Sequence, residues 1–319
     1  MSTTSPPRTA RGPLHAVGRY ARLVKYKFVI DFLLALVIVA TLLGPAALVS
    51  GTTPLALLFF ALGMLGVLAA VMTLDDVTGA QDGSDTANYV ETPSGQLRPL
   101  SRKPLLTGEI TVRDARAFGI AGLVWGVLWW AAALLYAPGE PWVIVTMALL
   151  AFLSVQYSWG LKFSYYGLGE AVLLFSAAAF LIAPYGLVTG QLPLMVLVQG
   201  LLFGFGQLLI AGYSNTNDVR GDAEAGRRTV AVLTSESGNK VFLAVLTCVN
   251  IAVIVVPVAV GALPWTFLLV LAPFVVLRVR QYAGFLRTGD PLVARSRGIW
   301  AFRTVVACLL LFNVLEAVL

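Results

Sequence analysis

The chain consists of long apolar stretches separated by short polar segments. A membrane-spanning helix needs about 20 consecutive, mostly apolar residues, and the pattern predicts nine helices of this kind. They cover residues 28–50, 54–74, 115–136, 141–158, 168–188, 192–213, 239–260, 264–284 and 299–318. The predicted fold class is therefore all-α, a polytopic membrane bundle of nine transmembrane helices.

Composition agrees with this pattern. The chain has 319 residues, of which 58% are hydrophobic and only 12% are charged, whereas about 25% are charged in a typical soluble domain. We expect one transmembrane domain at residues 28–319, preceded by a basic, disordered cytoplasmic tail at residues 1–27. In such a chain the net charge of +6 reports topology, so we expect no nucleic-acid partner. The only histidine, His15, leaves no histidine set for zinc or haem.

Lysine and arginine indicate the orientation. All 22 lie in the N-terminal tail, in the connections after the second, fourth, sixth and eighth spans, or at helix ends bordering them. The other connections, "SGTTP", "APGEP", "VTGQLP" and "GALP", contain none. The positive-inside rule then places the N-terminus and the charged segments in the cytoplasm. We also expect no charge in the middle of a span, which argues against an ion transporter.

Two of the predicted cytoplasmic segments, 75–114 and 214–238, are rich in acids followed by basic residues. If the sixth span continues as a helix, Asp218 and Asp222 lie one turn apart on one face. In the first segment Asp75, Asp82 and Asp85 have spacings that suit one helical face. One such cluster alone would be equally typical of a solvated loop, but two at equivalent positions favour a common task.

Acids paired at a membrane surface suit a specific chemistry. Mg²⁺ prefers carboxylate oxygens and binds through one or two carboxylates plus substrate phosphates, so two facing clusters would hold roughly two or three ions against a diphosphate. Arginine and lysine nearby would bind the remaining phosphate oxygens. Surrounded by apolar helices, the pattern predicts a site for a lipid diphosphate.

Three motifs then resemble one family. "DVRGDAEAGRRT" resembles the second Asp-rich motif of the UbiA superfamily of intramembrane prenyltransferases, D-x-x-x-D-x-x-x-G-x-x-T, beginning at Asp218. Tyr213 stands where the family has an upstream tyrosine. "YSWGLKFSYYGLGE" resembles the stretch that links the fourth and fifth helices, and "KPLLTGEIT" resembles the R-P-L-x-S-G segment, with Lys103 in place of arginine.

The first Asp-rich motif departs from the family pattern N-D-x-x-D-x-x-x-D. Asp75 and Asp76 take the Asn-Asp place, but the next expected acids fall on Gly79 and Gly83. A second register begins at Gln81-Asp82, with Asp85 as its second acid. The sequence leaves both registers open.

The resemblance implies a Mg²⁺-dependent enzyme that ionises an isoprenyl diphosphate and transfers the prenyl group to a small neutral or aromatic, hydrophobic acceptor. The alternative is a UbiA-type terpene cyclase, in which the substrate's own alkene captures the cation. The implied metal ligands are Asp75, Asp76, Asp82, Asp85, Asp218 and Asp222. The implied catalytic residues are Asp76, Asp82, Asp218, Asp222, Lys103, Lys162, Tyr157 and Tyr213. The implied substrate-binding residues are Arg102, Lys103, Lys162, Arg228 and Asn215.

Overall fold

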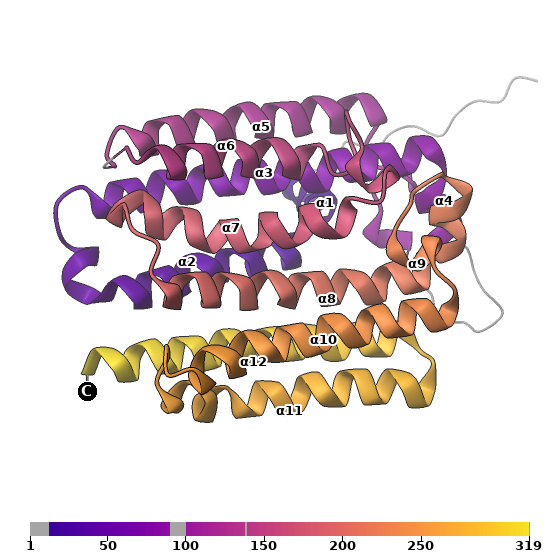
Figure 1. Cartoon of the computed structure of the whole chain (residues 1–319). Coiled ribbons are helices and arrows are strands. Elements are labelled where there is room, and N and C mark those ends of the chain that lie inside the picture. The colour runs from indigo at the N-terminus through magenta and orange to yellow at the C-terminus, as the bar shows by residue number, and fades with distance from the viewer. Residues whose placement is uncertain (1–12, 90–99, 138, 319) are drawn as a thin grey trace, which may run out of the picture.

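The computed structural model describes residues 13–89, 100–137 and 139–318, and these ranges contain helices and no strand. Figure 1 shows the long helices lying side by side in one bundle. The helices are α1 (Pro13–Leu23), α2 (Tyr26–Leu48), α3 (Thr53–Asp82), α4 (Ser84–Tyr89), α5 (Val112–Leu134), α6 (Pro141–Val155), α7 (Gly169–Thr189), α8 (Leu194–Glu224), α9 (Val230–Leu233), α10 (Glu236–Ala259), α11 (Trp265–Thr288) and α12 (Pro291–Val318). Two short 3-10 helices, Leu100–Arg102 and Phe163–Tyr165, lie in the connections. The all-α prediction is confirmed.

The nine predicted spans correspond to nine helices, but not all of them have the length to cross a bilayer. Within the described residues, eight helices are long and apolar enough. The exception is α6, whose 15 residues extend only about 22 Å at 1.5 Å per residue, against a hydrocarbon core of about 30 Å. Its predicted end, at residue 158, was too late because the backbone leaves the helix at Gln156. The protein is an integral membrane protein, and the count of nine spanning helices is not confirmed.

The helices α3 and α5 pack through glycines. A Cβ on Gly66 would lie 2.5 Å from the carbonyl oxygen of Gly122, and a Cβ on Gly126 would lie 2.9 Å from that of Gly63. Only glycine permits this backbone approach, which is a common mode of helix association in membranes. The packing fixes α3, whose C-terminal end carries the first acid cluster.

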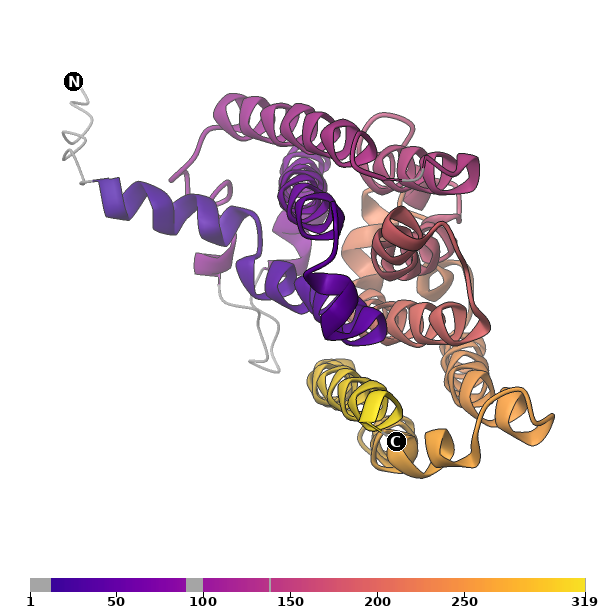
Figure 2. The same ribbon diagram turned by 90° about the vertical axis from the view of Figure 1, so that its left-hand side faces the viewer.

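The N-terminal segment differs from the predicted disordered tail. Residues 13–23 form α1, which Figure 2 shows extending sideways from the bundle. Arg19 donates a hydrogen bond from Nη1 to the carbonyl oxygen of Glu109 at 2.8 Å, and Arg22 forms an ion pair with the Glu109 carboxylate. Leu23 is fully buried beside Val77. The described part of the predicted tail is therefore ordered by contacts, while residues 1–12 lie outside the described residues.

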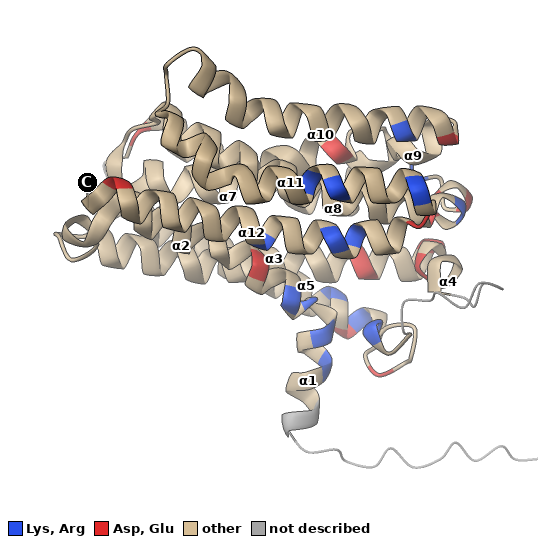
Figure 3. Ribbon diagram, turned by 90° about the horizontal axis from the view of Figure 1, so that it is seen from below, with Lys and Arg blue, Asp and Glu red and all other residues tan. Residues whose placement is uncertain are grey.

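Charged residues gather at one end of the bundle, where α4 and α9 lie (Figure 3). The expectation that no charge occurs in the middle of a span is wrong, however. Arg278 lies in the central part of α11 and is fully buried. Its guanidinium lies 5.2 Å from the ring centroid of Phe274 and donates a hydrogen bond to Gln281 at 2.5 Å. The local aromatic and amide groups replace part of the solvation that the charge loses on burial.

Candidate active site

A cavity of about 260 Å³ opens at the charged end of the bundle. Its polar part is lined by side chains from α3, α4, α8, the connections that follow them and the junction of α1 and α2: Lys25, Asp75, Asp85, Asn88, Arg102, Lys103, Asn215, Asp218, Asp222 and Arg227. Its apolar part lies along α2, α3, α7 and α8, and includes Phe28, Phe32, Leu68, Val71, Met72, Leu173, Phe180 and Ile210. One cavity therefore offers charge at one end and hydrocarbon at the other, which suits an amphiphilic ligand.

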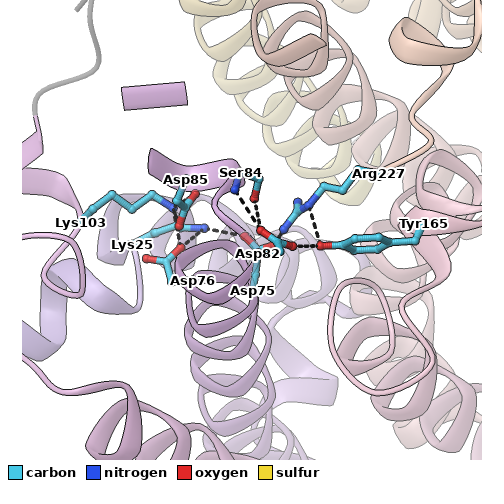
Figure 4. Close-up of polar contacts among 9 residues, drawn as sticks. All are labelled: Lys25, Asp75, Asp76, Asp82, Ser84, Asp85, Lys103, Tyr165 and Arg227. Carbon is cyan, nitrogen blue, oxygen red and sulfur yellow. Dashed lines mark hydrogen bonds and ion pairs between the residues drawn. The ribbon is translucent and has the colours of Figure 1, made fainter. Parts of the chain in front are cut away.

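Two lysines bridge three carboxylates, those of Asp75 and Asp76 on α3 and of Asp85 on α4 (Figure 4). We call this side of the cavity the α3 wall. The ammonium of Lys103 lies 2.8 Å from Asp76 Oδ1 and 2.7 Å from both carboxylate oxygens of Asp85. The ammonium of Lys25 lies 3.0 Å from Asp75 Oδ2 and 2.9 Å from Asp76 Oδ1. Asp76 is only 1% exposed and does not line the cavity. The placement gives Asp76 the role of holding the two lysines rather than direct access to a ligand.

Asp85 reaches this cluster because α4 folds back over the end of α3. Gly83 ends α3 with φ +84°, a left-handed conformation that glycine adopts without strain, and α4 begins at Ser84. A Cβ built on Gly79 would lie 2.7 Å from Cγ of Asp85. The Asp85 carboxyl group thus occupies the space beside α3 into which a side chain at position 79 would extend. The geometry follows neither of the two registers that the sequence left open.

Asp82 does not line the cavity. Its Oδ1 accepts hydrogen bonds from the backbone N–H and the hydroxyl of Ser84 at 3.0 and 2.8 Å, and its Oδ2 accepts one from the Tyr165 hydroxyl. These contacts fix the turn between α3 and α4. The predicted metal-binding and catalytic roles of Asp82 have no support in this placement, because its carboxylate is engaged in local structure.

The second cluster lies on the opposite wall. α8 continues as a helix to Glu224, beyond the predicted span of 192–213, so the condition under which Asp218 and Asp222 stand one turn apart is met. Both are buried and line the cavity. Asn217 donates a hydrogen bond to Asp218 Oδ1 at 2.9 Å. α4 packs directly on this helix, since a Cβ on Gly221 would lie 2.2 Å from Oδ1 of Asn88.

The loop after α8 directs Arg227, not Arg228, into the cavity. Arg227 Nη2 lies 3.3 Å from Asp75 Oδ1, and its Nε donates a hydrogen bond to the Tyr165 hydroxyl at 3.3 Å. Arg228 is exposed and does not line the cavity. Gly226 and Thr229, the last two positions of the second Asp-rich motif, each have a local structural role. Gly226 adopts φ +78°, and Thr229 is the N-cap of α9. Of these two adjacent arginines, the structure places Arg227 in the cavity, whereas the sequence analysis had named Arg228 as substrate-binding.

Two of the cations that border the first cluster, Lys103 and Arg227, have raised pKa values and keep their charge. Burial lowers the pKa of Lys103, but the carboxylates of Asp76 and Asp85 outweigh burial and hold the pKa above its ordinary value. Burial also lowers the pKa of Arg227, but Asp75 together with Tyr165, Tyr157 and Asp222 outweighs burial, so the pKa of Arg227 is raised. At neutral pH the wall therefore presents an ammonium and a guanidinium to any anionic group that enters.

The donor set suits a hard cation. Among the residues that the structure describes, no three His, Cys, Asp or Glu side chains are close enough together to hold a metal ion by themselves. Mg²⁺ does not need such a cage, because it binds through one or two carboxylates and takes its other ligands from phosphate and water. Asp218 and Asp222 supply such a pair, facing the cavity.

The chain matches the UbiA prenyltransferase family over residues 35–306. It belongs to this family. None of the curated proteins compared with the chain matches it.

Solved structures share the fold of this UbiA family member. A UbiA homologue from Archaeoglobus fulgidus, bound to GPP and Mg²⁺, has a TM-score of 0.65 and 16% identity, covering 93% of this chain and 99% of that one. Digeranylgeranylglyceryl phosphate synthase has a TM-score of 0.62 and 14% identity, over 94% of this chain and 99% of that one. An apo UbiA homologue from Aeropyrum pernix K1 has a TM-score of 0.58 and 13% identity, over 91% of this chain and 98% of that one.

Within this UbiA fold the structure divides the remaining predicted residues. Arg102, Tyr157 and Asn215 line the cavity, and Asn215 donates a hydrogen bond to Glu170 at 3.1 Å. Lys162 and Tyr213 do not line it. The ammonium of Lys162 lies 4.9 Å from the ring centroid of Tyr165. The Tyr213 ring is fully buried and packs 5.1 Å from that of Phe285 on α11, away from the carboxylates.

Sequence reasoning missed two cations of the UbiA cavity. Lys25 was counted only among the basic residues that set topology, although it lies directly between two carboxylates. Arg295, on α12, lines the cavity and donates a hydrogen bond from Nε to Ser214 Oγ at 2.8 Å. The only available signal was that each stands next to the end of a predicted span that was expected to face the cytoplasm, as many topology-setting residues also do.

Proposed function

We propose that the protein is a Mg²⁺-dependent membrane prenyltransferase that ionises an isoprenyl diphosphate and transfers the prenyl group to a small hydrophobic acceptor, neutral or aromatic. The observation that carries this proposal is the single cavity in which carboxylates and cations at one end adjoin an apolar interior. A diphosphate suits the charged end and a prenyl chain suits the other. By the positive-inside rule the charged end faces the cytoplasm.

The charged end supports binding of the diphosphate. Asp218 and Asp222 would hold Mg²⁺, which when bound supplies Lewis-acid stabilisation of the leaving group. Lys103 and Arg227 would donate to the phosphate oxygens that the metal does not reach. Support comes from the Archaeoglobus fulgidus homologue, which is bound to GPP and Mg²⁺ in one structure and to DMAPP and Mg²⁺ in another.

The apolar part of the cavity suits the prenyl chain after ionisation. Cleavage of the allylic carbon–oxygen bond leaves the electron pair on the diphosphate oxygen and a cation on the prenyl group. The ring of Tyr157, which lines the cavity beside the carboxylates, can stabilise that cation by about 0.5–2 kcal/mol. The acceptor's nucleophilic atom then forms the new bond and loses a proton. Phe28, Phe32 and Phe180 line the apolar part and restrict the entry of water.

The size of the cavity keeps cyclisation as a second candidate. Its volume of about 260 Å³ is below the roughly 300–1,000 Å³ of typical ligand pockets. A prenyl chain would leave little room for a separate acceptor. A terpene cyclase would need only a contour that folds the chain back on its own cation.

Mass balance distinguishes these functions. Purified protein is given radiolabelled C10, C15 or C20 prenyl diphosphate and Mg²⁺, with and without membrane extract. A transferase releases little product beyond slow hydrolysis until the extract supplies an acceptor, and then forms a prenylated one. Rapid formation of a cyclic hydrocarbon or terpene alcohol without extract would contradict transfer. An intact diphosphate under every condition would contradict both functions.

A further inference from the structure

We propose that the ammonium groups of Lys25 and Lys103 act in place of a metal ion on the α3 wall. The substrate's diphosphate would lie between these two lysines and a metal ion held only by Asp218 and Asp222 across the cavity. The inference rests on the function proposed above and specifies its binding site. It departs from the sequence-based expectation that both acid clusters hold Mg²⁺.

Charge on the α3 wall is already balanced by protein groups. Asp75, Asp76 and Asp85 contribute three carboxylates. Lys25, Lys103 and Arg227 each have an ion-pair contact with at least one of them, at distances from 2.7 to 3.3 Å. A metal ion entering here would meet cations at contact distance from the oxygens it needs, and like charges repel strongly where solvent is scarce.

The carboxylate oxygens that would bind a metal are already engaged. Asp76 Oδ1 is shared by both ammonium groups, at 2.9 Å from Lys25 and 2.8 Å from Lys103. Asp76 Oδ2 has no hydrogen-bond partner, but it is buried and Asp76 does not line the cavity, so a metal ion in the cavity does not reach it. Both oxygens of Asp85 accept from Lys103. A metal could take these ligands only by displacing a lysine.

Lys25 is held in position by its surroundings. It adopts a left-handed conformation, with φ +52°, at the junction of α1 and α2. A left-handed lysine costs backbone energy and persists only where neighbouring contacts enforce it. Those contacts come from α1, through the bonds of Arg19 and Arg22 to Glu109. Because Lys25 also lines the cavity, its ammonium is positioned to meet the phosphate.

The test counts bound metal ions directly. Mn²⁺ favours the same oxygen ligands as Mg²⁺ and is paramagnetic, so electron paramagnetic resonance measures free and bound ion in the presence of inorganic pyrophosphate. We expect about one Mn²⁺ per chain in the unaltered protein, and about two in Lys25→Met, where Asp75 and Asp76 lose an ammonium partner. Lys25→Arg keeps the charge and should bind one. Lys240→Met, at an exposed ion pair with Glu236 on α10, is the matched control and should bind one.

Each other outcome contradicts a distinct statement. Two or more ions in the unaltered protein would overturn the role of the lysines while leaving the proposed function intact, and this needs no variant to fold. One ion in both the unaltered protein and a folded Lys25→Met would show that Lys25 does not exclude a metal ion. This result would also overturn the role proposed for the two lysines. No bound ion in the unaltered protein with pyrophosphate would contradict the proposed function itself.

Discussion

The carboxyl group of Asp85 lies directly against Gly79, where a Cβ would come within 2.7 Å of its Cγ. The contact explains how a chain that lacks an acid at position 79 still places a third carboxylate beside Asp75 and Asp76. The helix α4 supplies it from six residues further along the chain. The absence of a side chain at Gly79 is therefore a structural requirement of this version of the first Asp-rich segment.

A side chain at position 79 should disrupt the cluster. Gly79→Ala pushes Asp85 away and leaves Lys103 with a weaker partner, so we expect kcat/KM for a prenyl diphosphate to fall at least about tenfold, the equivalent of one charge-assisted hydrogen bond. The double variant Gly79→Asp/Asp85→Gly returns an acid to α3 itself and should recover part of the loss. Steady-state kinetics measure both. Unchanged kinetics in Gly79→Ala would show that the position of Asp85 is unimportant.

Adjacent arginines give a matched pair of variants. Arg227→Met removes a guanidinium that lines the cavity, and a lost hydrogen bond from a charged group costs about 1.5–3 kcal/mol, or roughly ten- to a hundredfold in kcat/KM. Arg228→Met removes an exposed guanidinium outside the cavity and should change kcat/KM less than about twofold. The reverse order of effects would contradict the assignment of Arg227.

The apolar part of the cavity should set the preferred chain length. Leu68 lies two turns before Asp75 on α3, about 10 Å from it at 1.5 Å per residue, and it lines the cavity. Leu68→Ala should shift the ratio of kcat/KM values toward longer prenyl diphosphates. Leu202→Ala is the control, because this fully buried leucine lies outside the cavity. Both substitutions should lower the free energy of unfolding by about 2–5 kcal/mol, so the loss of stability is matched between them. A shift in chain-length preference in both variants would contradict the assignment of that preference to the cavity lining.

Much of the fold could be predicted from the sequence because membrane spans are encoded locally. Each span is a run of apolar residues, and once α8 is known to continue past residue 213, helical spacing alone places Asp218 and Asp222 one turn apart. The length of α6 was overestimated because the three residues after it, Gln156 to Ser158, contain no glycine, proline or charged side chain that would mark its end. Both Asp residues of α8 were placed correctly for the same reason of periodicity.

The first cluster could not be predicted in the same way. Its geometry depends on the reversal at Gly83 and on ion pairs between residues far apart in the sequence, 50 positions for Lys25 with Asp75 and 152 for Arg227 with Asp75. Asp82 and Asp85 have similar sequence surroundings, yet only Asp85 faces the lysines. The choice between Arg227 and Arg228 depends likewise on the backbone direction after Gly226. Such choices are made by tertiary contacts, which spacing does not report.

The predicted orientation can be tested independently of activity. After Cys248 and Cys308 are replaced, single cysteines at positions 224 and 139 report on the two ends of the bundle. In intact cells a membrane-impermeant thiol reagent should label position 139 and leave position 224 unlabelled, because the positive-inside rule places the charged end in the cytoplasm. A third cysteine at position 95, which lies outside the described residues, should behave like position 224. Opposite labelling at any position would refute the orientation.

The proposed function depends most on Asp218 and Asp222, which would hold the Mg²⁺ that binds the substrate's diphosphate. The most direct test is the release of diphosphate from radiolabelled prenyl diphosphate by purified protein, with Mg²⁺ or with EDTA, in the presence of membrane extract as the source of acceptor. Release should require Mg²⁺. It should fall by at least about a hundredfold in Asp222→Asn, since a stabilising charge at the leaving group is lost. Asp82→Asn, whose carboxylate lies outside the cavity, should keep most of the activity. Full release in EDTA, or from Asp222→Asn, would contradict the central claim.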